Sequence, residues 1–336
     1  MPETDILILG GRETQALLEG RERDIIEAVR DAYVTHGRGE SSLPHSTFLR
    51  FPDNPSNRII ALPAYLGGDF GVAGLKWIAS FPGNLERGLE RASAVLVLNS
   101  TETGHPEAIL EASLISAKRT AASAALAAET LHAGPVERAA LVGCGLINFE
   151  IARFLRTAFP SLKGFVIYDT SEARAAEFAA RCAREFGPVE VETAADAGRA
   201  LASEGLISLA TTALSPHIRD LSACPPGATV LHVSLRDLTP EAILSSDNVV
   251  DDVDHVCRAQ TSVHLAEQLT GGRDFIRCTL ADILDGRAAA RGGDGRAVVF
   301  SPFGLGVLDL AVGKLVYEQG RREGVGTTLG AFLPGG

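Results

Sequence analysis

The chain has 336 residues, of which 46% are hydrophobic, and its formal net charge is −11 at pH 7. This length can bury the cores of two domains, and the acidic balance, with dispersed lysines and arginines, argues against a nucleic-acid-binding protein. No apolar run reaches the length of a membrane span, and the first five residues lack the basic start of a signal peptide. The five cysteines contain no C-x-x-C pair, which favours free thiols and a cytoplasmic location.

The first hundred residues predict a sheet whose later strands have no helices between them. A helix beginning near Glu22 follows the first strand, and a turn rich in Asp, Asn and Pro at 52–57 predicts a hairpin. Strands are expected at 6–9, 46–51, 58–65, 71–81 and 94–99. Because helical crossovers are missing between these strands, we expect a largely antiparallel sheet.

Two cations in this part of the chain stand in apolar surroundings. Lys76 belongs to an apolar strand beside Trp77, so its ammonium must reach solvent, pair with an acid or meet an anionic ligand. Arg119 belongs to a predicted helix at 113–131 that is dense in small residues, and its guanidinium is a candidate fork for a carboxylate or a phosphate. For both residues a solvated surface position remains the alternative at this stage.

The most informative stretch is a buried strand, a glycine turn and the start of a helix near residue 145. Gly143 permits a tight reversal after the strand, and Gly145, which has no Cβ, lets a pyrophosphate approach the positive end of the helix dipole. This pattern predicts that Gly143, Gly145, Leu146 and Ile147 bind a dinucleotide. Asn148 stands at the third position of the usual G-x-G-x-x-G, so a strand-to-helix turn without a ligand remains the alternative.

A second apolar strand, 164–168, ends at Asp169, where a Rossmann fold places the acid that binds the adenosine ribose. A carboxylate there would repel a 2′-phosphate, so Asp169 favours NAD over NADP. Arg174, one helical turn further on, leaves NADP open.

Beyond Asp169, helices and strands alternate, which predicts the α/β class with a Rossmann-type doubly wound parallel sheet. Helices are expected at 172–186, 195–203, 255–269 and 307–323, and strands at 189–192, 206–210, 229–233, 249–250 and 297–300. Ligands bind at the carboxyl ends of such strands, so we expect Thr211, Ser234 and Asp237 in the cofactor crevice. The acidic run 251–254 could suggest a metal site, but we favour a helix cap and expect no metal.

We therefore expect two domains. Residues 1–118 with 305–336 would form an α+β domain, largely antiparallel, that binds substrate and mediates dimerisation, and 119–304 would form the NAD-binding Rossmann domain. The strands of the first domain have too few flanking helices to cover both faces of a sheet. The apolar surface left over predicts a homodimer.

Several segments together resemble the ornithine cyclodeaminase/μ-crystallin family of NAD(P)-dependent enzymes along nearly the whole chain. The matching segments are 62–64, 74–76, 116–121, 143–145, 210–212 and 300–304, with Asp309 soon after the last. The resemblance implies an NAD cofactor, with Thr120 among its contacts. It also implies that Lys76 and Arg119 hold the carboxylate of a small amino-acid substrate, and that Asp237 acts on the substrate amine or on water.

One departure and one closer likeness refine this expectation. Many members carry an Arg in a P-x-R segment, whereas this chain has Leu43-Pro44-His45-Ser46, which argues against ornithine cyclodeaminase activity. The segments 58–68, 76–84, 145–148 and 234–237 are similar to one branch of the family. That branch oxidises N-(2-amino-2-carboxyethyl)-L-glutamate with NAD and releases 2-oxoglutarate and L-2,3-diaminopropionate, a siderophore or antibiotic precursor.

For that substrate, which has three carboxylates, Arg50 or Arg58 could bind another of them. Other activities of the family remain open: ornithine or lysine cyclodeaminase, alanine dehydrogenase and ketimine reductase. A protein that binds NAD(P) without catalysis is the alternative from a different class.

Overall fold

The computed structural model describes residues 5–334 and divides into two compact units. Unit 1 is Met1–Arg119 with Leu305–Gly336, and unit 2 is Thr120–Gly304, so one boundary falls inside helix α3 (Ser113–Leu131). Residues 1–4, which belong to the segment expected to lack a signal peptide, lie outside the described residues. No helix in the described range is long and apolar enough to cross a membrane. The assignment of substrate and cofactor to the two units, and the cytoplasmic location, stay predictions.

Unit 1 is built on one sheet whose strand order is β16-β1-β7-β6-β5-β4-β2, with β3 paired to β4. Its strands are β1 (Ile6–Leu9), β2 (Ser41–Ser42), β3 (Thr47–Phe51), β4 (Asn54–Leu66), β5 (Val72–Ser80), β6 (Ala92–Ser100), β7 (Pro106–Glu111) and β16 (Thr327–Leu329). Apart from the parallel pair β1 and β7, the pairings are antiparallel, as expected. Its helical segments are α1 (Gly11–Leu18), α2 (Glu22–Gly37), the 3-10 turn η1 (Pro82–Arg87), the start of α3 and α11 (Gly306–Glu323).

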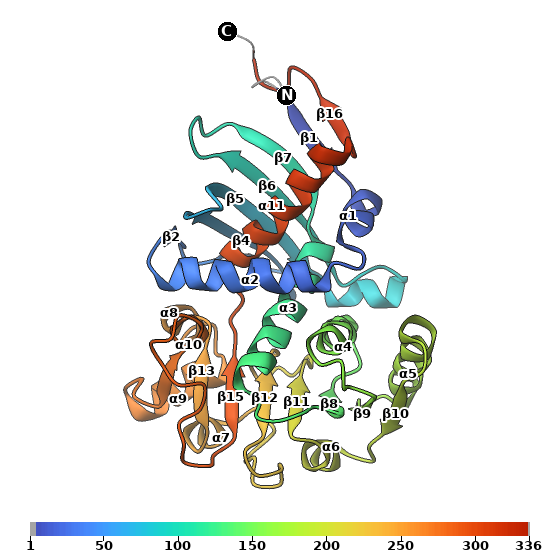
Figure 1. Cartoon of the computed structure of the whole chain (residues 1–336), viewed down its shortest axis with the longest axis vertical. Helices are drawn as coiled ribbons and strands as arrows, with labels where there is room; N and C mark the ends of the chain where they lie inside the picture. The colour runs from blue at the N-terminus through green and yellow to red at the C-terminus, as the bar shows by residue number, and fades with distance from the viewer. Residues whose placement is uncertain (1–4, 335–336) are drawn as a thin grey trace. The chain divides into compact units, whose positions relative to one another are not determined.

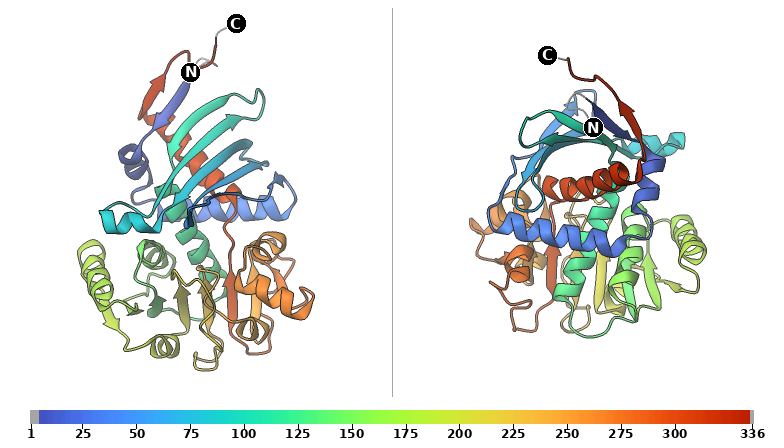
Figure 2. Two further views of the ribbon diagram at one scale, coloured as in Figure 1. Left: turned by 180° about the vertical axis from the view of Figure 1, so that it is seen from behind. Right: turned by 45° about the horizontal axis from the view of Figure 1, so that its top comes forward.

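Helix α11 packs directly on β4, β5 and β6, and both views in Figure 2 show it lying across the sheet of unit 1. Two glycines permit this close approach. A Cβ at Gly74 would collide with Leu310 and with the carbonyl oxygen of Val97, and a Cβ at Gly313 would collide with Leu96. The register aligns Leu62, Lys76 and Leu96 on the face that α11 covers. This face therefore forms the core of unit 1.

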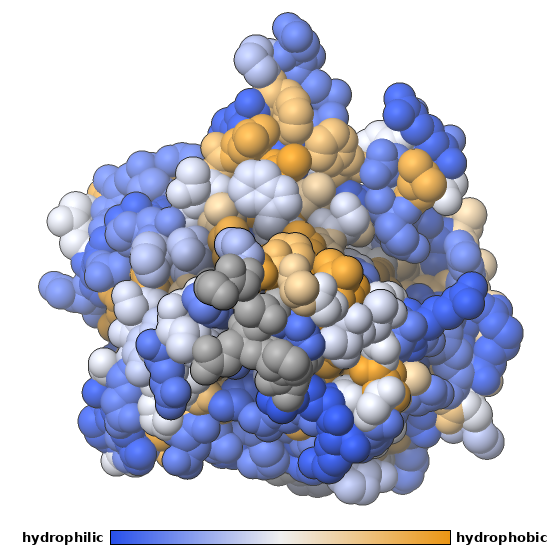
Figure 3. All heavy atoms as spheres, turned by 90° about the horizontal axis from the view of Figure 1, so that it is seen from above, coloured by the Kyte–Doolittle hydropathy of each residue, from blue (hydrophilic) through white to orange (hydrophobic). Residues whose placement is uncertain are grey.

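Among the described residues of unit 1, no helix covers the opposite face of the same sheet as α11 covers the first. Trp77 points to it, with its cross-strand partners Ala61 and Val95, and the side chains of Leu49, Tyr65 and Trp77 are exposed. Seen from above, the surface shows hydrophobic residues gathered among hydrophilic ones near the middle of the view (Figure 3).

Unit 2 is a parallel sheet in the order β10-β9-β8-β11-β12-β15-β13-β14, with helices on it as Figure 1 shows. Its strands are β8 (Arg138–Val142), β9 (Gly164–Tyr168), β10 (Glu190–Thr193), β11 (Leu206–Leu209), β12 (Thr229–His232), β13 (Asp247–Val250), β14 (Ile276–Thr279) and β15 (Val298–Ser301). Its helices are α4 (Leu146–Ala158), α5 (Glu172–Phe186), α6 (Ala197–Ser203), α7 (Pro240–Leu244), α8 (Val253–Val256), α9 (Ser262–Thr270) and α10 (Leu280–Leu284). The predicted doubly wound sheet is confirmed, and its strand order reverses between β8 and β11.

Two sequence predictions of local structure are wrong. The hairpin turn is not at 52–57: β4 already starts at Asn54, paired with Phe51, so only Pro52 and Asp53 connect the strands. Pro and Asp suit the central positions of such a tight turn. The helix expected at 255–269 is two helices, α8 and α9, because residues 259 and 260 have φ angles of 52° and 56°.

The acidic run after β13 caps a helix, as favoured. The side chain of Asp252 accepts the backbone N–H of His255 at the start of α8. Within the described residues, no group of three or more His, Cys, Asp or Glu side chains is arranged to hold a metal ion.

Candidate active site

A buried ionic cluster in unit 1 brings together two of the predicted site residues. Lys76, on β5, donates from Nζ to Asp309 Oδ2 at 2.7 Å and to Ser116 Oγ at 3.1 Å. Arg119, on α3, donates from Nε to the other oxygen, Asp309 Oδ1, at 3.1 Å. We call these four residues, Lys76, Ser116, Arg119 and Asp309, the Lys76 cluster. Lys76 and Arg119 are both buried, so the solvated surface position is wrong for each.

The Lys76 cluster carries one more positive charge than negative charge when all three groups are ionised. Asp309 is fully buried and Lys76 is 2% exposed. Burial lowers the pKa of Lys76 to about 8, Asp309 opposes this shift, and Arg119 adds to it. A buried charge without a full partner is costly, so an anion bound here would be stabilised. The cluster is therefore suited to a single carboxylate.

Asp309 follows the last segment of the family resemblance, but the sequence alone does not give it a role. It lies in the first turn of α11, among the apolar residues Val307, Leu308 and Leu310. Lys76 drew attention because it is a charged residue in an apolar stretch, and the same is true of Asp309. Two opposite charges in apolar stretches could have suggested a buried ion pair.

Arg50 and Arg58 are not part of the Lys76 cluster. They are cross-strand partners in the β3–β4 hairpin, and the guanidinium of Arg50 lies 5.5 Å from the ring centre of Phe48. Arg58 is four residues before Leu62, the partner of Lys76, which is about 13 Å along the strand. Any role of theirs toward a second carboxylate stays a prediction.

In unit 2 the glycine turn has the geometry that a dinucleotide site requires. Gly143 has a φ of 96°, and a Cβ there would lie 2.5 Å from the carbonyl oxygen of Ala210. Gly145 precedes α4, and a Cβ built on it would meet only Arg174, at 3.7 Å. The space beside the first amides of α4 is therefore open for an anionic group. Leu146 is exposed and Ile147 is half-buried at this helix start.

Asn148 explains why the turn can lack its third glycine. Its side-chain amide donates to the carbonyl oxygens of Val142 and Gly143, at 2.9 and 2.7 Å, and its oxygen accepts from Ser208 Oγ at 2.7 Å. These bonds tie the turn to β8 and to β11. Asn148 thus supports the turn through its side chain.

Asp169 stands at the end of β9, where the ribose-binding acid was expected. Its Oδ2 accepts the backbone N–H of Cys144 at 2.8 Å, and its Oδ1 accepts that of Ser171 at 2.9 Å. The guanidinium of Arg174 lies 3.7 Å from Asp169 Oδ2, so the two residues whose charges bear on the choice of cofactor are partners in this structure. Thr120, also predicted at the cofactor, is half-buried on α3.

A second cluster forms around Asp237, after the carboxyl end of β12. Asp237 is fully buried, the hydroxyl of Thr211 donates to its Oδ1, and the hydroxyl of Ser234 donates to its Oδ2. The structure therefore brings these three predicted residues together. We call Asp237, Thr211, Ser234, His217 and His232 the Asp237 cluster.

The two histidines of the Asp237 cluster are not singled out by the sequence. His232 Nε2 accepts the backbone N–H of Asp237 at 3.2 Å, and its Nδ1 lies 3.1 Å from Ser301 Oγ. Burial lowers the pKa of His232 to about 4, against the attraction of Asp237, so this imidazole is neutral at pH 7. His217 Nε2 lies 3.9 Å from Asp237 Oδ1. A histidine inside the apolar strand 229–233 is the signal that could have suggested this network.

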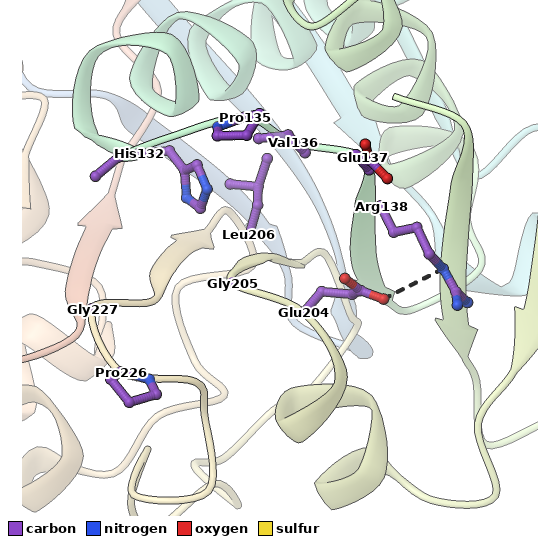
Figure 4. Close-up of a pocket in the computed structure, with 11 residues that line it drawn as sticks. His132, Pro135, Val136, Glu137, Arg138, Glu204, Gly205, Leu206, Pro226 and Gly227 are labelled. Carbon is purple, nitrogen blue, oxygen red and sulfur yellow. Dashed lines mark ion pairs between the residues drawn. The ribbon is translucent and has the colours of Figure 1, made fainter. Parts of the chain in front are cut away.

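A hollow of about 450 Å³ lies at the amino ends of the unit 2 strands, among residues next to the starts of β8, β11 and β12. Figure 4 shows its lining, in which Arg138 pairs with Glu204 across 3.4 Å. Gly143 and Asp237 follow the carboxyl ends of their strands, so this hollow is separate from both.

The model of the ornithine cyclodeaminase/mu-crystallin family matches residues 13–324. The chain belongs to this family. N-((2S)-2-amino-2-carboxyethyl)-L-glutamate dehydrogenase of Staphylococcus aureus is 28% identical to the chain over 98% of it and 97% of the relative.

Two solved structures of similar proteins contain the expected cofactor. Delta(1)-pyrroline-2-carboxylate reductase of Thermococcus litoralis, solved with NADH and L-proline, matches with a TM-score of 0.89 and 25% identity over 96% of this chain and 99% of that one. An archaeal alanine dehydrogenase dimer with bound NAD matches with a TM-score of 0.86 and 26% identity over 97% and 99%. The predicted family and fold are thus confirmed, and these relatives are NAD-dependent oxidoreductases of amino and imino acids.

Proposed function

We propose that the chain oxidises N-(2-amino-2-carboxyethyl)-L-glutamate with NAD and hydrolyses the resulting imine to 2-oxoglutarate and L-2,3-diaminopropionate. The observation that supports a substrate with a carboxylate is the Lys76 cluster, with its buried surplus of one positive charge. The Staphylococcus aureus relative, whose name states this substrate, supports the particular compound.

The residues around the glycine turn fit NAD. Gly143 and Gly145 leave the amides at the start of α4 open to the pyrophosphate, and Asp169 would accept hydrogen bonds from the ribose hydroxyls. When bound, NAD supplies the acceptor for a hydride. Arg174 is paired with Asp169, so it would have to break this ion pair before it could bind the 2′-phosphate of NADP. This pairing supports NAD over NADP.

Lys76 and Arg119 would bind one carboxylate of the substrate. Asp309 holds the ammonium and the guanidinium through different oxygens, so both cations are oriented before a substrate arrives. Such fixed partners orient the C–H bond that reacts, which is the main contribution a protein makes to hydride transfer.

Asp237 would accept the proton of the substrate ammonium. A hydride can leave the α-carbon only when the neighbouring nitrogen has a free lone pair, so this proton must be removed first. The carboxyl group of Asp237 is held by two hydroxyls, so after taking this proton it can orient the water that attacks the imine.

Steady-state turnover with NAD, followed at the absorbance of NADH, tests this proposal. We expect N-(2-amino-2-carboxyethyl)-L-glutamate to react with a higher kcat/KM than alanine, ornithine, lysine or proline. A preference for one of these smaller amino acids would assign a different activity of the family, and NAD binding without any turnover would favour a non-catalytic protein.

We also propose a homodimer formed through the open face of the unit 1 sheet. The exposed apolar side chains of Leu49, Tyr65 and Trp77 support it, as does the related alanine dehydrogenase, which is a dimer. Trp77 is the single tryptophan of the chain, so its fluorescence reports on this face. We expect light scattering to give a dimer for the wild type and for Leu89→Glu, whose exposed side chain follows η1, and a monomer for Trp77→Glu. A monomeric wild type at micromolar concentration would contradict the proposal.

A further inference from the structure

We propose that His217 carries the proton between the buried carboxylate of Asp237 and solvent. This inference rests on the proposed function, in which Asp237 takes a proton from the substrate. His217 Nε2 lies 3.9 Å from Asp237 Oδ1, and the His217 side chain is 47% exposed whereas that of Asp237 is 0% exposed. One imidazole therefore lies next to the buried carboxylate and is also open to solvent.

The need for such a group follows from the proton balance of the reaction. Each oxidation removes one proton from the substrate ammonium and one hydride from its α-carbon, so Asp237 is left protonated after each turnover. A fully buried carboxylic acid cannot give this proton to bulk water directly. The O–H bond of Asp237 would break as an N–H bond forms on His217 Nε2, and the imidazolium would then release the proton to water or buffer, with no change in electrons.

The other members of the Asp237 cluster are less suited to this task. His232 is fully buried, and its Nε2 lone pair already accepts the backbone N–H of Asp237. Its lowered pKa agrees with a histidine that stays neutral. The hydroxyls of Thr211 and Ser234 can pass a proton on only if they take up another at once. An imidazole takes up and releases a proton readily near neutral pH.

The backbone holds His217 in place, and its side chain is half exposed. The backbone N–H groups of His217 and Ile218 donate to the carbonyl oxygen of Asp237, at 2.9 and 2.8 Å, and Ile218 forms a bridge with Leu238. The present gap of 3.9 Å is longer than a hydrogen bond, and a rotation of the half-exposed ring or one bridging water would close it. Asp237 lies beside His217, and a charge on His217 would oppose protonation of His232.

Chemical rescue tests the inference. We expect His217→Ala to lower kcat about 10²-fold, in the range of general acid–base catalysis, with KM and the NAD dissociation constant changed less than twofold. Imidazole added to the buffer at constant pH should restore kcat of this variant in proportion to its concentration, and it should leave the wild type unchanged. His217→Gln, which keeps the bulk of the side chain but cannot carry a proton, should be as slow and should not be rescued.

The control is His105→Ala, which removes another exposed histidine, in unit 1, and should keep wild-type kcat. Wild-type kcat in His217→Ala, or a low kcat that neither imidazole nor another small base restores, would overturn the inference. Asp237→Asn separates this from a failure of the proposed function: if it is inactive while His217→Ala is fully active, only the role of His217 fails. Full activity of Asp237→Asn, or a wild type without turnover, would overturn both.

Discussion

The Lys76 cluster and the Asp237 cluster both bury ionisable groups, but they stabilise them by different means. In unit 1, one carboxylate lies between two cations, and the cluster keeps a surplus positive charge. In unit 2, the carboxylate of Asp237 is contacted by hydroxyls and lies near two imidazoles. A cation is a poor neighbour for a base because it stabilises the ionised carboxylate and weakens its hold on a proton. The comparison indicates that the first cluster is suited to hold an anion and the second to exchange a proton.

Removing the central carboxylate of the Lys76 cluster should have the largest effect on stability. Asp309→Ala leaves two buried cations next to each other, and we expect the free energy of unfolding to fall by roughly 3–5 kcal/mol. Urea denaturation measures this. Asp24→Ala, which breaks an exposed ion pair with Arg21 on α2, is the matched control and should cost less than about 1 kcal/mol. Equal losses for the two variants would mean that Asp309 does not hold the cluster together.

Removing either cation of the Lys76 cluster should lower kcat/KM for the substrate. In Lys76→Ala or Arg119→Ala, a bound carboxylate would lose a charge-assisted hydrogen bond, which is worth roughly 1.5–3 kcal/mol, or about tenfold to over a hundredfold in kcat/KM. Steady-state kinetics measure this loss, and calorimetric titration should give an unchanged NAD affinity for Lys76→Ala. A kcat/KM of Lys76→Ala within twofold of the wild type would show that Lys76 does not bind the substrate.

The choice of cofactor should depend on Asp169. We expect the wild type to bind NAD more tightly than NADP, and Asp169→Ala to weaken NAD binding about tenfold through the loss of hydrogen bonds to the ribose. The difference in affinity between NAD and NADP should be smaller in this variant. Titration calorimetry with both cofactors checks it, and equal or tighter binding of NADP by the wild type would contradict the assignment.

The smallest expected effect is a pH dependence of substrate binding. The pKa of Lys76 is lowered to about 8, so its ammonium loses a proton, and the cluster its surplus charge, as the pH rises through this value. We expect KM to rise several-fold between pH 7 and pH 9, because an unprotonated Lys76 no longer attracts a carboxylate. Lys76→Met carries no charge at either pH and should lack this rise. The same rise in Lys76→Met would assign it to another group.

Much of the fold could be predicted from sequence because its signals are local. The strand, glycine turn and helix around Gly143 occupy consecutive residues, and helix α3 has the predicted bounds Ser113–Leu131. The break between α8 and α9 could not be seen, since Ala259 and Gln260 adopt positive φ angles that neither residue type announces. The short strand β7 could not be predicted from sequence, because it begins with Pro106 and its polar and apolar residues do not clearly alternate.

The residues of the two clusters also differ in how well the sequence predicts them. Lys76, Arg119 and Asp237 could be found from their surroundings and from the family motifs. Asp309 is 233 residues from Lys76, and the bond between them exists only once α11 packs on β5. His217 is 20 residues before Asp237, in a loop without a motif, and only the fold brings its ring toward the carboxylate. Partners made by tertiary packing leave little trace in a single sequence.

We propose that the two clusters have different tasks: the Lys76 cluster binds an anion, and the Asp237 cluster moves a proton. The most direct measurement is kcat and KM for N-(2-amino-2-carboxyethyl)-L-glutamate in Asp237→Asn and Lys76→Ala, side by side, with NAD binding titrated separately. We expect Asp237→Asn to lower kcat by about 10²–10⁴-fold with KM nearly unchanged. Lys76→Ala should mainly raise KM, and both variants should bind NAD like the wild type. Turnover of Asp237→Asn at the wild-type rate would show that Asp237 is not the base.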